Sequence, residues 1–329
     1  MDACKRRHRV LFRSGATGLA LLAWGASSAN ADTYPAKPVT IVVAQAPGGG
    51  NDAVARILAA RLSTVYGQQF IVDNRPGAGG NIGSAFAARA PKDGYTIFMT
   101  SSSHTINPSL YKRVPYEPVE DFAPIAMVAN VTFVLVANPD FAARTTAQLI
   151  ELAKQQPGKI NYASAGNGTL NHLLAEMLKS GTGVEMAHVP YKGSAAALTD
   201  VISGQVPVGF NSLTAARPFI KSGQLRALGV SSQRRSALAP DIPPVADAVP
   251  GFDAIAWYGL VAPAGTPKQI VDSLAREVSK SLSNPEVVES LGKQGAEPAY
   301  LAPDAMAAFL KKDLKSWASV VKGSGAQVD

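Results

Sequence analysis

The sequence predicts an α/β protein with two lobes, and three observations lead to this fold class. Apolar runs rich in β-branched residues alternate with segments of helical period, which is typical of sheets whose two faces are covered by helices. The order of strand, glycine-rich turn and helix opens the chain and returns more than 100 residues later. Apolar residues make up 47% and charged residues 17% of the 329 residues, which excludes a disordered or fibrous protein.

The first repeat of this order lies near the start of the chain. A strand is predicted at Val39–Val43, a glycine-rich turn at Pro47–Asp52, and a helix over residues 54–65, where apolar residues recur on one face. Asn51 or Asp52 suits the N-cap of this helix, since its side-chain oxygen can accept a free backbone N–H. Two further strands, each followed by a turn, are predicted at 70–72 and 96–99.

The second repeat lies in the middle of the chain. Its strand is predicted at Lys159–Ala163, its turn at Ser164–Thr169, and its helix from Leu170 onwards, with Gly181 as the stop. Because strands alternate with helices in both repeats, we expect each lobe to be a mostly parallel sheet flanked by helices.

Two apolar segments, 131–137 and 256–261, can carry the chain from one lobe to the other and back. If both cross, the first lobe is discontinuous and includes the helices near the C-terminus. Lobe 1 is then predicted to comprise residues 32–133 plus 255–329, and lobe 2 residues 134–254.

Residues 1–31 have the order of a secretory signal peptide. Five basic residues precede the short apolar run Gly15–Gly25, and Ala29 and Ala31 frame a cleavage site. The run falls short of the ~20 residues of a membrane span, so we predict cleavage after Ala31 and an exported protein. This segment carries a net charge of +4, and its removal lowers the formal net charge from +7 to +3. So small a charge argues against nucleic-acid binding.

The two glycine-rich turns suggest anion binding. The first N–H groups of a helix lack acceptors within the helix, the helix dipole is positive there, and glycine lets an anion approach the backbone. Two such turns that face each other across a cleft can hold the two ends of a small acid. Such turns also occur in α/β proteins for steric reasons alone, so the prediction depends on the pair.

Motifs for other chemistries are missing from the sequence. The segment Gly77–Gly83 has Ile82 where a dinucleotide fingerprint needs its third glycine, and no G-x-x-x-x-G-K-[ST] phosphate loop occurs. His104, His172 and His188 are not spaced as zinc ligands, and no G-x-S-x-G elbow presents a nucleophilic serine. We therefore expect no cofactor, no metal site and no catalytic residue.

Several motifs, taken together, resemble those of a known family. They are Tyr34–Pro38, Ala46–Asp52 with Arg56, Asn74–Gly83, Pro91–Thr96, Asn161–Ser164 with Gly166, Gly168 and His172, Val189–Gly193, Gly223–Leu228, Trp257–Leu260 and Pro263–Pro267. In this order and spacing they resemble the solute receptors of tripartite tricarboxylate transporters, also called the Bug family. The resemblance implies a two-lobed periplasmic binding protein fold, type II-like, and a periplasmic receptor rather than an enzyme.

The resemblance also implies a ligand and partners. The ligand is a small carboxylate, namely a di- or tricarboxylate, an amino acid or an aromatic acid, and the partners are integral-membrane transporter subunits; we expect a monomer. In the family, backbone N–H groups and waters at the two βα turns hold the carboxylates. Carried over to this sequence, the ligand-binding residues are Pro47, Gly49, Gly50, Asn51, Asp52, Ser101, Ser102, His104, Ser164, Gly166, Gly168, Thr169, His172, Tyr191, Lys192 and Gly193.

Asn211 departs from the family pattern and completes the ligand-binding set. The family often has an aspartate at this position, after the sequence Gly204-Gln205-Val206. The loss of that negative charge implies a shift away from ligands that bear an amine. We expect Asn211→Asp to change ligand selectivity more than fold stability.

Two other functions stay open on the sequence alone. An exported hydrolase on the same scaffold would need a histidine within hydrogen-bond reach of Ser102, Ser103 or Ser164, and an acid to orient that histidine. A sensor that presents its ligand to a membrane kinase would share the features of a transport receptor. Structural roles are also open: His172 and Lys192 suit surface positions, and Asp52 suits a helix cap.

Overall fold

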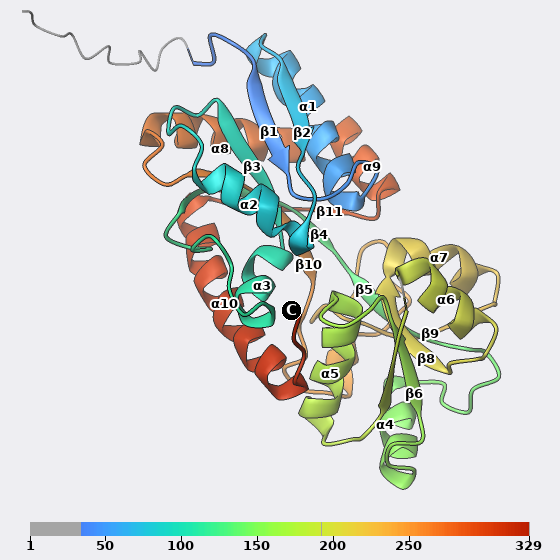
Figure 1. Cartoon of the computed structure of the whole chain (residues 1–329). Helices are drawn as coiled ribbons and strands as arrows, with labels where there is room; N and C mark the ends of the chain where they lie inside the picture. The colour runs from blue at the N-terminus through green and yellow to red at the C-terminus, as the bar shows by residue number, and fades with distance from the viewer. Residues whose placement is uncertain (1–33, 192, 329) are drawn as a thin grey trace, which may run out of the picture.

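The computed structural model describes residues 34–191 and 193–328 and arranges them in two lobes (Figure 1). The predicted signal peptide, residues 1–31, and the predicted site residue Lys192 lie outside the described residues. One sheet of the order β11-β4-β10-β3-β1-β2 forms the centre of the first lobe. Its strands are β1 (Val39–Val43), β2 (Phe70–Asn74), β3 (Thr96–Ser101), β4 (Phe122–Val131), β10 (Ala256–Pro263) and β11 (Glu297–Leu301).

Helices cover both faces of this first sheet. Successive side chains of β1 point to opposite faces, so that Ile41 packs on one side and Val42 on the other. The Ile41 face is covered by α1 (Gly50–Tyr66), α8 (Lys268–Leu282) and α9 (Pro285–Lys293). The Val42 face and the lower edge carry η2 (Ala78–Gly80), α2 (Asn81–Ala88), α3 (Ser103–Leu110) and α10 (Pro303–Ser324).

The second lobe is built in the same way on a sheet of the order β7-β6-β8-β5-β9. Its strands are β5 (Phe133–Ala137), β6 (Asn161–Ser164), β7 (Ala187–Pro190), β8 (Val208–Ser212) and β9 (Arg226–Val230). One face is covered by α4 (Thr146–Gln155) and α5 (Leu170–Thr182), the other by α6 (Ser194–Ile202) and α7 (Leu213–Lys221), while η3 (Val245–Asp247) lies beside β9. Helix α5 ends at the left-handed Gly183 and not at Gly181, the predicted stop.

The α/β class and the two lobes are confirmed, but the prediction that each sheet is mostly parallel is wrong, since both are mixed. β1 runs parallel to β2 and β3, whereas β10 runs antiparallel to β3 and β4. Likewise β6 runs parallel to β7 and β8, whereas β5 runs antiparallel to β8 and β9. Neighbouring parallel strands need a crossover connection, usually a helix, that returns the chain to the same end of the sheet. β5 and β10 each enter their sheet from the other lobe without such a helix, and so run antiparallel to their neighbours. Hydrophobic periodicity identifies such a strand but not its direction.

The two segments that connect the lobes lie side by side. β4 continues into β5 through the buried Thr132, and Ala256 of β10 pairs with Val131 at the end of β4. Ser231 also links them, since its N–H donates to the Phe133 carbonyl at 2.8 Å and its carbonyl accepts the Ala254 N–H at 3.0 Å. The connection is therefore a hydrogen-bonded pair of segments, which places the ends of β3, β6 and β8 around one space between the lobes (Figure 1).

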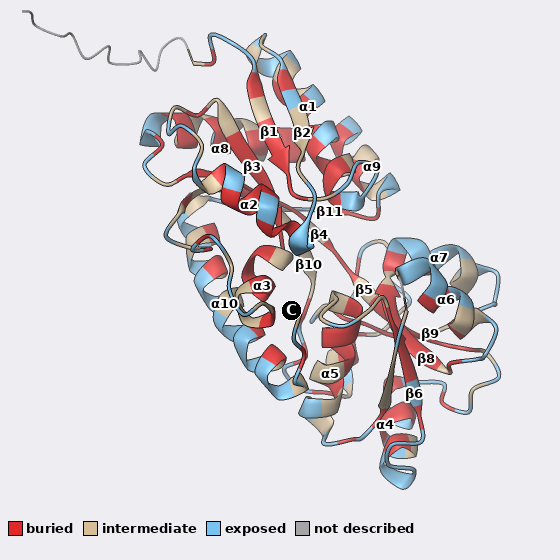
Figure 2. Cartoon of the chain, viewed as in Figure 1, coloured by how far each residue is buried: buried red, intermediate tan, exposed pale blue. Residues whose placement is uncertain are grey.

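Helix α10 packs against both lobes. Met306 and Leu310 join Trp257 in the core of the first lobe, whereas Trp317 near the far end belongs to the same apolar cluster as Leu173 of α5. Buried residues otherwise follow the strands of the two sheets, and the outer helix faces are exposed (Figure 2). Within the described residues, no helix is both long and apolar enough to span a membrane.

Candidate functional site

A cavity of about 430 Å³ lies between the two lobes. The first lobe contributes polar side chains from the ends of β1 and β3 and from α3: Gln45, Ser101, Ser102, Ser103 and Asn107. The second lobe contributes the turn between β6 and α5 and the end of β8: Asn167, Gly168, Thr169, Leu170 and Ser212. The apolar walls come from α3 and the connecting strands: Ile106, Leu110, Tyr111, Val131, Phe133 and Tyr258.

Three consecutive serines join β3 to α3 in the wall of the first lobe. The Ser101 hydroxyl lies 2.9 Å from that of Ser103 and accepts a hydrogen bond from Gln45 Nε2 at 3.1 Å. The Ser102 hydroxyl accepts the backbone N–H of Trp257 at 3.0 Å and so ties the turn to β10. The Ser101 and Ser103 hydroxyls are therefore the polar side-chain groups that this turn can offer to a bound molecule.

Two helices direct their N-terminal ends at the cavity. In α3 the first helical hydrogen bond between residues four apart runs from the Ile106 N–H to the Ser102 carbonyl. In α5 the first such bond runs from the Leu173 N–H to the Thr169 carbonyl. The N–H groups that precede these donors have no acceptor of this type inside their helix. Since the N-terminal end of a helix dipole is positive, both walls favour an anion.

The turn between β6 and α5 uses some of its own N–H groups. Gly166 and Gly168 have φ values of +125° and +73°, which glycine adopts without strain. The Gly166 N–H donates to the Ser164 hydroxyl at 3.1 Å, and the Gly168 N–H donates to Nδ1 of His172 at 3.2 Å. Both glycine donors are thus occupied within the protein, and the first turn of α5 supplies the remaining ones.

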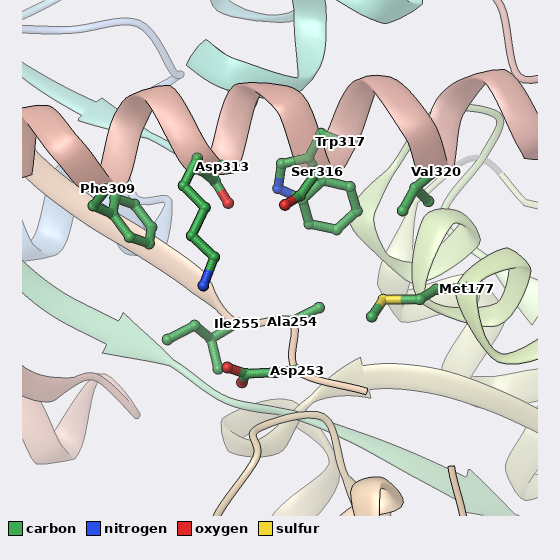
Figure 3. Close-up of a pocket in the computed structure, with 10 residues that line it drawn as sticks. Met177, Asp253, Ala254, Ile255, Phe309, Asp313, Ser316, Trp317 and Val320 are labelled. Carbon is green, nitrogen blue, oxygen red and sulfur yellow. The ribbon is translucent and has the colours of Figure 1, made fainter. Parts of the chain in front are cut away.

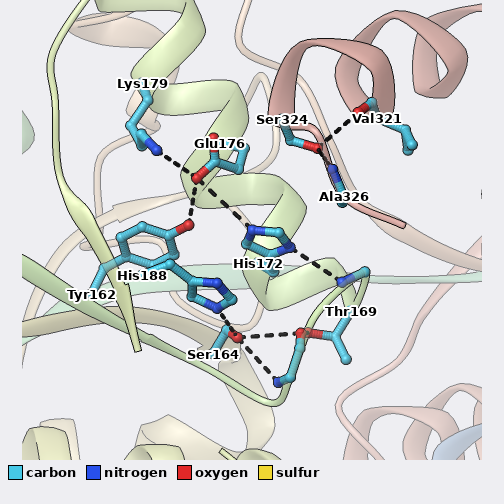
Figure 4. Close-up of polar contacts among 12 residues, drawn as sticks. Tyr162, Ser164, Thr169, His172, Glu176, Lys179, His188, Val321, Ser324 and Ala326 are labelled. Atoms are coloured by element: carbon cyan, nitrogen blue, oxygen red, sulfur yellow. Dashed lines mark hydrogen bonds and ion pairs between the residues drawn. The ribbon is translucent and has the colours of Figure 1, made fainter. Parts of the chain in front are cut away.

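Three stacked rings lie behind this turn (Figure 4). The imidazoles of His172 and His188 have centroids 4.0 Å apart, and Tyr162 stacks on His188 at 5.0 Å. Tyr162 and His188 are direct neighbours on the parallel strands β6 and β7, and His172 lies in the first turn of α5. The strand register therefore builds the stack and brings Nε2 of His188 to 2.6 Å from the Ser164 hydroxyl.

Glu176 on α5 anchors the stack from the other side. It accepts hydrogen bonds from the Tyr162 hydroxyl and from Lys179 at 2.7 Å, and lies 3.9 Å from Nε2 of His172. Burial is the main cause that lowers the pKa of both imidazoles, and the pKa of His188 falls to about 4. Nδ1 of His172 accepts a backbone N–H, so this neutral ring carries its proton on Nε2, toward Glu176.

The predicted turn Pro47–Asp52 does not line the cavity. Pro47, Gly49 and Gly50 are exposed. Helix α1 begins at Gly50 with Gly49 as its N-cap, so the prediction of an N-cap at Asn51 or Asp52 is wrong. The reason is that Gly49 has the extended backbone of an N-cap, with φ −76° and ψ 164°, so the helix begins two or three residues earlier than predicted. Asn51 and Asp52 are consequently buried in the first turn.

The Asp52 carboxylate holds this loop in place. It accepts hydrogen bonds at 2.9 Å each from the Gly48 N–H, from Nε of Arg56 and from the Asn74 amide. Burial alone would raise the pKa of Asp52, but these three donors together hold it below its ordinary value. Asp52 thus orders the loop and does not face the cavity.

Three more of the predicted residues also lie away from the cavity lining. His104 stacks on Tyr116 at 5.1 Å, its Nε2 lies 2.8 Å from the Pro118 carbonyl oxygen, and burial lowers its pKa to about 4. The Tyr191 hydroxyl donates to Asp200 at 2.7 Å. Gly193 is the N-cap of α6.

Asn211 sits beside the cavity but points elsewhere. Its neighbour Ser212 lines the cavity, and adjacent residues of a strand face opposite sides. The Asn211 side chain is fully buried, and neither its Nδ2 nor its Oδ1 has a hydrogen-bond partner among the described residues. An unpaired buried amide is costly to the fold.

Several lining residues were not predicted from the sequence. Trp257 is fully buried while Tyr258, the next residue on β10, lines the cavity, and the period-2 alternation of a strand could have indicated this. Gln45 is positioned by Asn51, whose amide donates to its Oε1 at 2.6 Å. Val328 reaches the cavity because its N–H donates to the Leu110 carbonyl at 2.9 Å. No local sequence signal marks that contact.

A second, smaller cavity of about 160 Å³ lies where α10 passes from one lobe to the other (Figure 3). Phe309, Asp313 and Trp317 of α10 line one side, and the segment 253–255 lines the other. Asp313 accepts hydrogen bonds from the Thr105 hydroxyl at 2.7 Å and from the indole of Trp257 at 3.0 Å. This carboxylate therefore joins α3, β10 and α10 beside the connecting segments.

The contacts around Ser164 differ from those that the hydrolase alternative requires. His188 does pair with Ser164, as the hydrolase alternative requires, but the Ser164 side chain is fully buried and is not among the cavity-lining residues. The carboxylate of Glu176 lies 3.9 Å from Nε2 of His172, so the acid is placed beside His172 and not beside the partner of Ser164. No group of three or more His, Cys, Asp or Glu side chains among the described residues could hold a metal ion.

The sequence matches one family over most of its length. The family described as "Tripartite tricarboxylate transporter family receptor" matches residues 54–326. The "UPF0065 protein in tcbD-tcbE intergenic region" of Pseudomonas sp. (strain P51) is 39% identical over 96% of this chain and 94% of its own length. "Protein BugT" of Bordetella pertussis is 38% identical over 92% of this chain and 94% of its own length.

Solved structures of similar proteins share the fold. Rpa4515 of R. palustris with adipate is 36% identical, with a TM-score of 0.76 over 90% of this chain and 100% of that one. The periplasmic binding protein BugD is 37% identical, with a TM-score of 0.72 over 89% and 99%. MatC of Rhodopseudomonas palustris with bound malate is 30% identical, with a TM-score of 0.72 over 88% and 100%.

Proposed function

Because this chain belongs to the tripartite tricarboxylate transporter family of receptors, we propose that its interlobe cavity captures a small carboxylate for such a transporter. Proteins of this family bind solutes and are not enzymes. The neighbours Rpa4515 and MatC hold adipate and malate, which are both carboxylates. A hydrolase has no support from these relatives.

One observation carries the proposal: two helix N-termini and a serine turn meet at the same cavity from opposite lobes. The carboxylate would accept hydrogen bonds from the Ser101 and Ser103 hydroxyls on one side. On the other it would accept the N–H groups at the start of α5, beside Thr169. Such donors stabilise an anion without a cationic side chain.

Three of the other predicted residues support these donors from behind. Ser164 and His172 hold the turn between β6 and α5 by the hydrogen bonds described above, and His188, which was not predicted, is the partner of Ser164. Asp52 holds the loop before α1. We propose that Ser164, His172 and Asp52 position the site, in place of the direct ligand contacts that the resemblance implies for them.

Binding would draw the lobes together about the paired connecting segments. A ligand that contacts both lobes binds the closed form better and shifts the population toward it. The closed form is then the one that membrane subunits would recognise. We further propose export to the periplasm through cleavage after Ala31, and a monomeric receptor; the periplasmic neighbour BugD supports the location.

A thermal-shift and calorimetry panel tests the proposal. The purified protein is titrated with adipate, malate, citrate, benzoate and aspartate, and with adipamide as an uncharged control. A ligand that binds only the native state at 100 times its Kd adds about 2.7 kcal/mol to stability. We expect at least one acid to raise Tm and adipamide to have no effect. No shift with any acid would contradict the proposal.

A pair of serine variants locates the binding event. Ser103→Ala removes a hydroxyl that lines the cavity, whereas Ser222→Ala removes an exposed one at the end of α7. A hydrogen bond to a charged group contributes about 1.5–3 kcal/mol, so we expect at least about a tenfold weaker acid affinity for Ser103→Ala. Ser222→Ala should bind as the wild type does. Equal affinities for both variants would place the acid elsewhere.

A further inference from the structure

We infer that the acid taken by this cavity has an apolar body, carries no amine, and presents a single carboxylate to the two helix ends. This inference rests on the carboxylate-receptor function proposed above and narrows its ligand class. It follows from the chemistry of the side chains that line the cavity, and from the lack of charged side chains among those that the structure describes.

The lining contains no charged side chain among the residues that the structure describes. An ammonium group in the cavity would therefore be removed from water without an acidic partner, which is costly. An amino acid is consequently a poor fit to this site.

The same lack of charge limits the number of carboxylates. One carboxylate can be stabilised by the hydroxyls and N–H groups of the two turns. The described lining contains no lysine or arginine that could pair with a second or third carboxylate. Each further buried carboxylate would add a desolvation cost that the cavity does not offset. A tricarboxylate is thus disfavoured as well.

The rest of the lining is built to cover apolar surface. Ile106 and Leu110 are one helical turn apart on α3, and Leu170 of α5 belongs to the opposite wall. Val131, Phe133 and Tyr258 of the connecting strands complete the lining. Burial of hydrocarbon against such walls contributes roughly 25 cal/mol per Å². This term is available only to a ligand with an apolar body.

The size of the cavity agrees with a ring or a short chain. An apolar protein cavity of roughly 150 Å³ is enough to bind benzene. The interlobe cavity, at about 430 Å³, has room for a six-membered ring, a short linker and the carboxylate. A four-carbon hydroxy acid would leave much of the apolar wall uncovered.

Matched ligands test this inference. They are 3-phenylpropanoate and hexanoate as acids with an apolar body, phenylalanine with the same ring and an added amine, 3-phenylpropan-1-ol without the carboxylate, and malate and citrate as polar acids. We expect 3-phenylpropanoate or hexanoate to bind at least tenfold more tightly than each of the other four.

Tighter binding of citrate, malate or phenylalanine would overturn this inference while the receptor function stands. Failure of every acid would overturn both, and equal binding of the alcohol would contradict the role of the carboxylate.

Variants of one apolar wall residue provide a second test. Leu170→Asn places an amide in the cavity at the half-buried first residue of α5, whereas Val288→Asn changes an exposed residue of α9. We expect Leu170→Asn to weaken 3-phenylpropanoate about tenfold, equivalent to about 1.4 kcal/mol. Val288→Asn should bind as the wild type does. An unchanged affinity in a folded Leu170→Asn variant would overturn the inference.

Discussion

Nε2 of His188 lies 2.6 Å from the hydroxyl oxygen of Ser164, and this contact fixes the end of β6 next to the turn that lines the cavity. The Ser164 oxygen also accepts the Gly166 N–H, and its own proton has two acceptors within reach, the Gly166 carbonyl oxygen at 3.3 Å and Nε2 of His188. The tautomer of the neutral imidazole decides which group donates in the contact with His188. Burial and the neighbouring His172 disfavour a charged imidazole, so the ordering of one cavity wall is linked to the protonation state of a histidine.

We expect the protein to lose stability on acidification, in part through this contact. Burial lowers the pKa of His188 to about 4 and also lowers that of His172, so the unfolded chain binds more protons between pH 6.5 and 4. Stability therefore falls as the pH decreases through this window. Urea unfolding at several pH values should show a shallower dependence for His188→Gln than for the wild type.

The other charged groups around the stack are the same in both proteins. Glu176 and Lys179 remain, and so does His104, which is buried in the first lobe with a pKa of about 4. The difference between the two pH profiles thus isolates His188. Parallel profiles from pH 7 to 4 would refute its role in the pH dependence.

Gly168→Ala should impair both folding and binding. Its φ of +73° strains an alanine by about 1–2 kcal/mol, and the new Cβ would lie 3.1–3.2 Å from the side chains of Leu110 and Val328, which line the cavity. Gly183→Ala has the same backbone strain at φ +70°, with no atom within 4 Å of its Cβ. Urea unfolding and calorimetry compare the two variants.

The glycine pair separates backbone strain from contact with the site. We expect similar losses of stability from the strain in both variants, and weaker acid binding in Gly168→Ala alone. If Gly183→Ala weakens binding equally, the effect comes from global stability and not from the turn.

Asp52→Asn should affect stability more than ligand choice. The substitution weakens the hydrogen bonds to Arg56, Asn74 and the Gly48 N–H, at a cost of about 1–3 kcal/mol. The lowered pKa of Asp52 means that its contribution is present above pH ~3.9 and is lost as the pH falls further. Asp272→Asn, at an exposed ion pair with Lys268, is the control and should change stability by less than ~0.5 kcal/mol. A changed ligand order with full stability would instead assign Asp52 to the cavity.

Local sequence pattern predicts the strands and the two turns, but not how the turns are used. The strand at Val39–Val43 and the turn at Ser164–Thr169 are where the sequence predicts them, because a run of β-branched residues and a glycine-rich turn are local properties. Ser101 and Ser102 at the end of β3, and Gly168 and Thr169 in the turn after β6, do line the cavity. The turn at Pro47–Asp52 is also rich in glycine, yet its Asp52 is bound to side chains 4 and 22 residues away and the turn does not line the cavity.

The remaining parts of the site depend on contacts that no local pattern encodes. His188 meets Ser164 because of the register of β6 against β7, and Val328 reaches the cavity because α10 ends against the other lobe. Strand direction is likewise a property of the whole path, as β5 and β10 illustrate. A single sequence indicates which residues can bind an anion, whereas the packing of the lobes decides which of them do.

The structure reverses the expectation for Asn211→Asp. The sequence led us to expect a change in selectivity more than in stability, but the side chain is fully buried and its amide has no partner among the described residues. An ionised aspartate there would be an unpaired buried charge, so its folded pKa would be raised. Stability would then be lost as the pH rises above the ordinary aspartate pKa of ~3.9, by several kcal/mol at pH 8.

Urea unfolding at pH 5 and pH 8 should show the larger loss of stability for Asn211→Asp at pH 8. Asn211→Leu, which removes the unpaired polar atoms, should be neutral or stabilising at both pH values. An Asn211→Asp variant with wild-type stability at pH 8 and an altered ligand order would restore the first expectation.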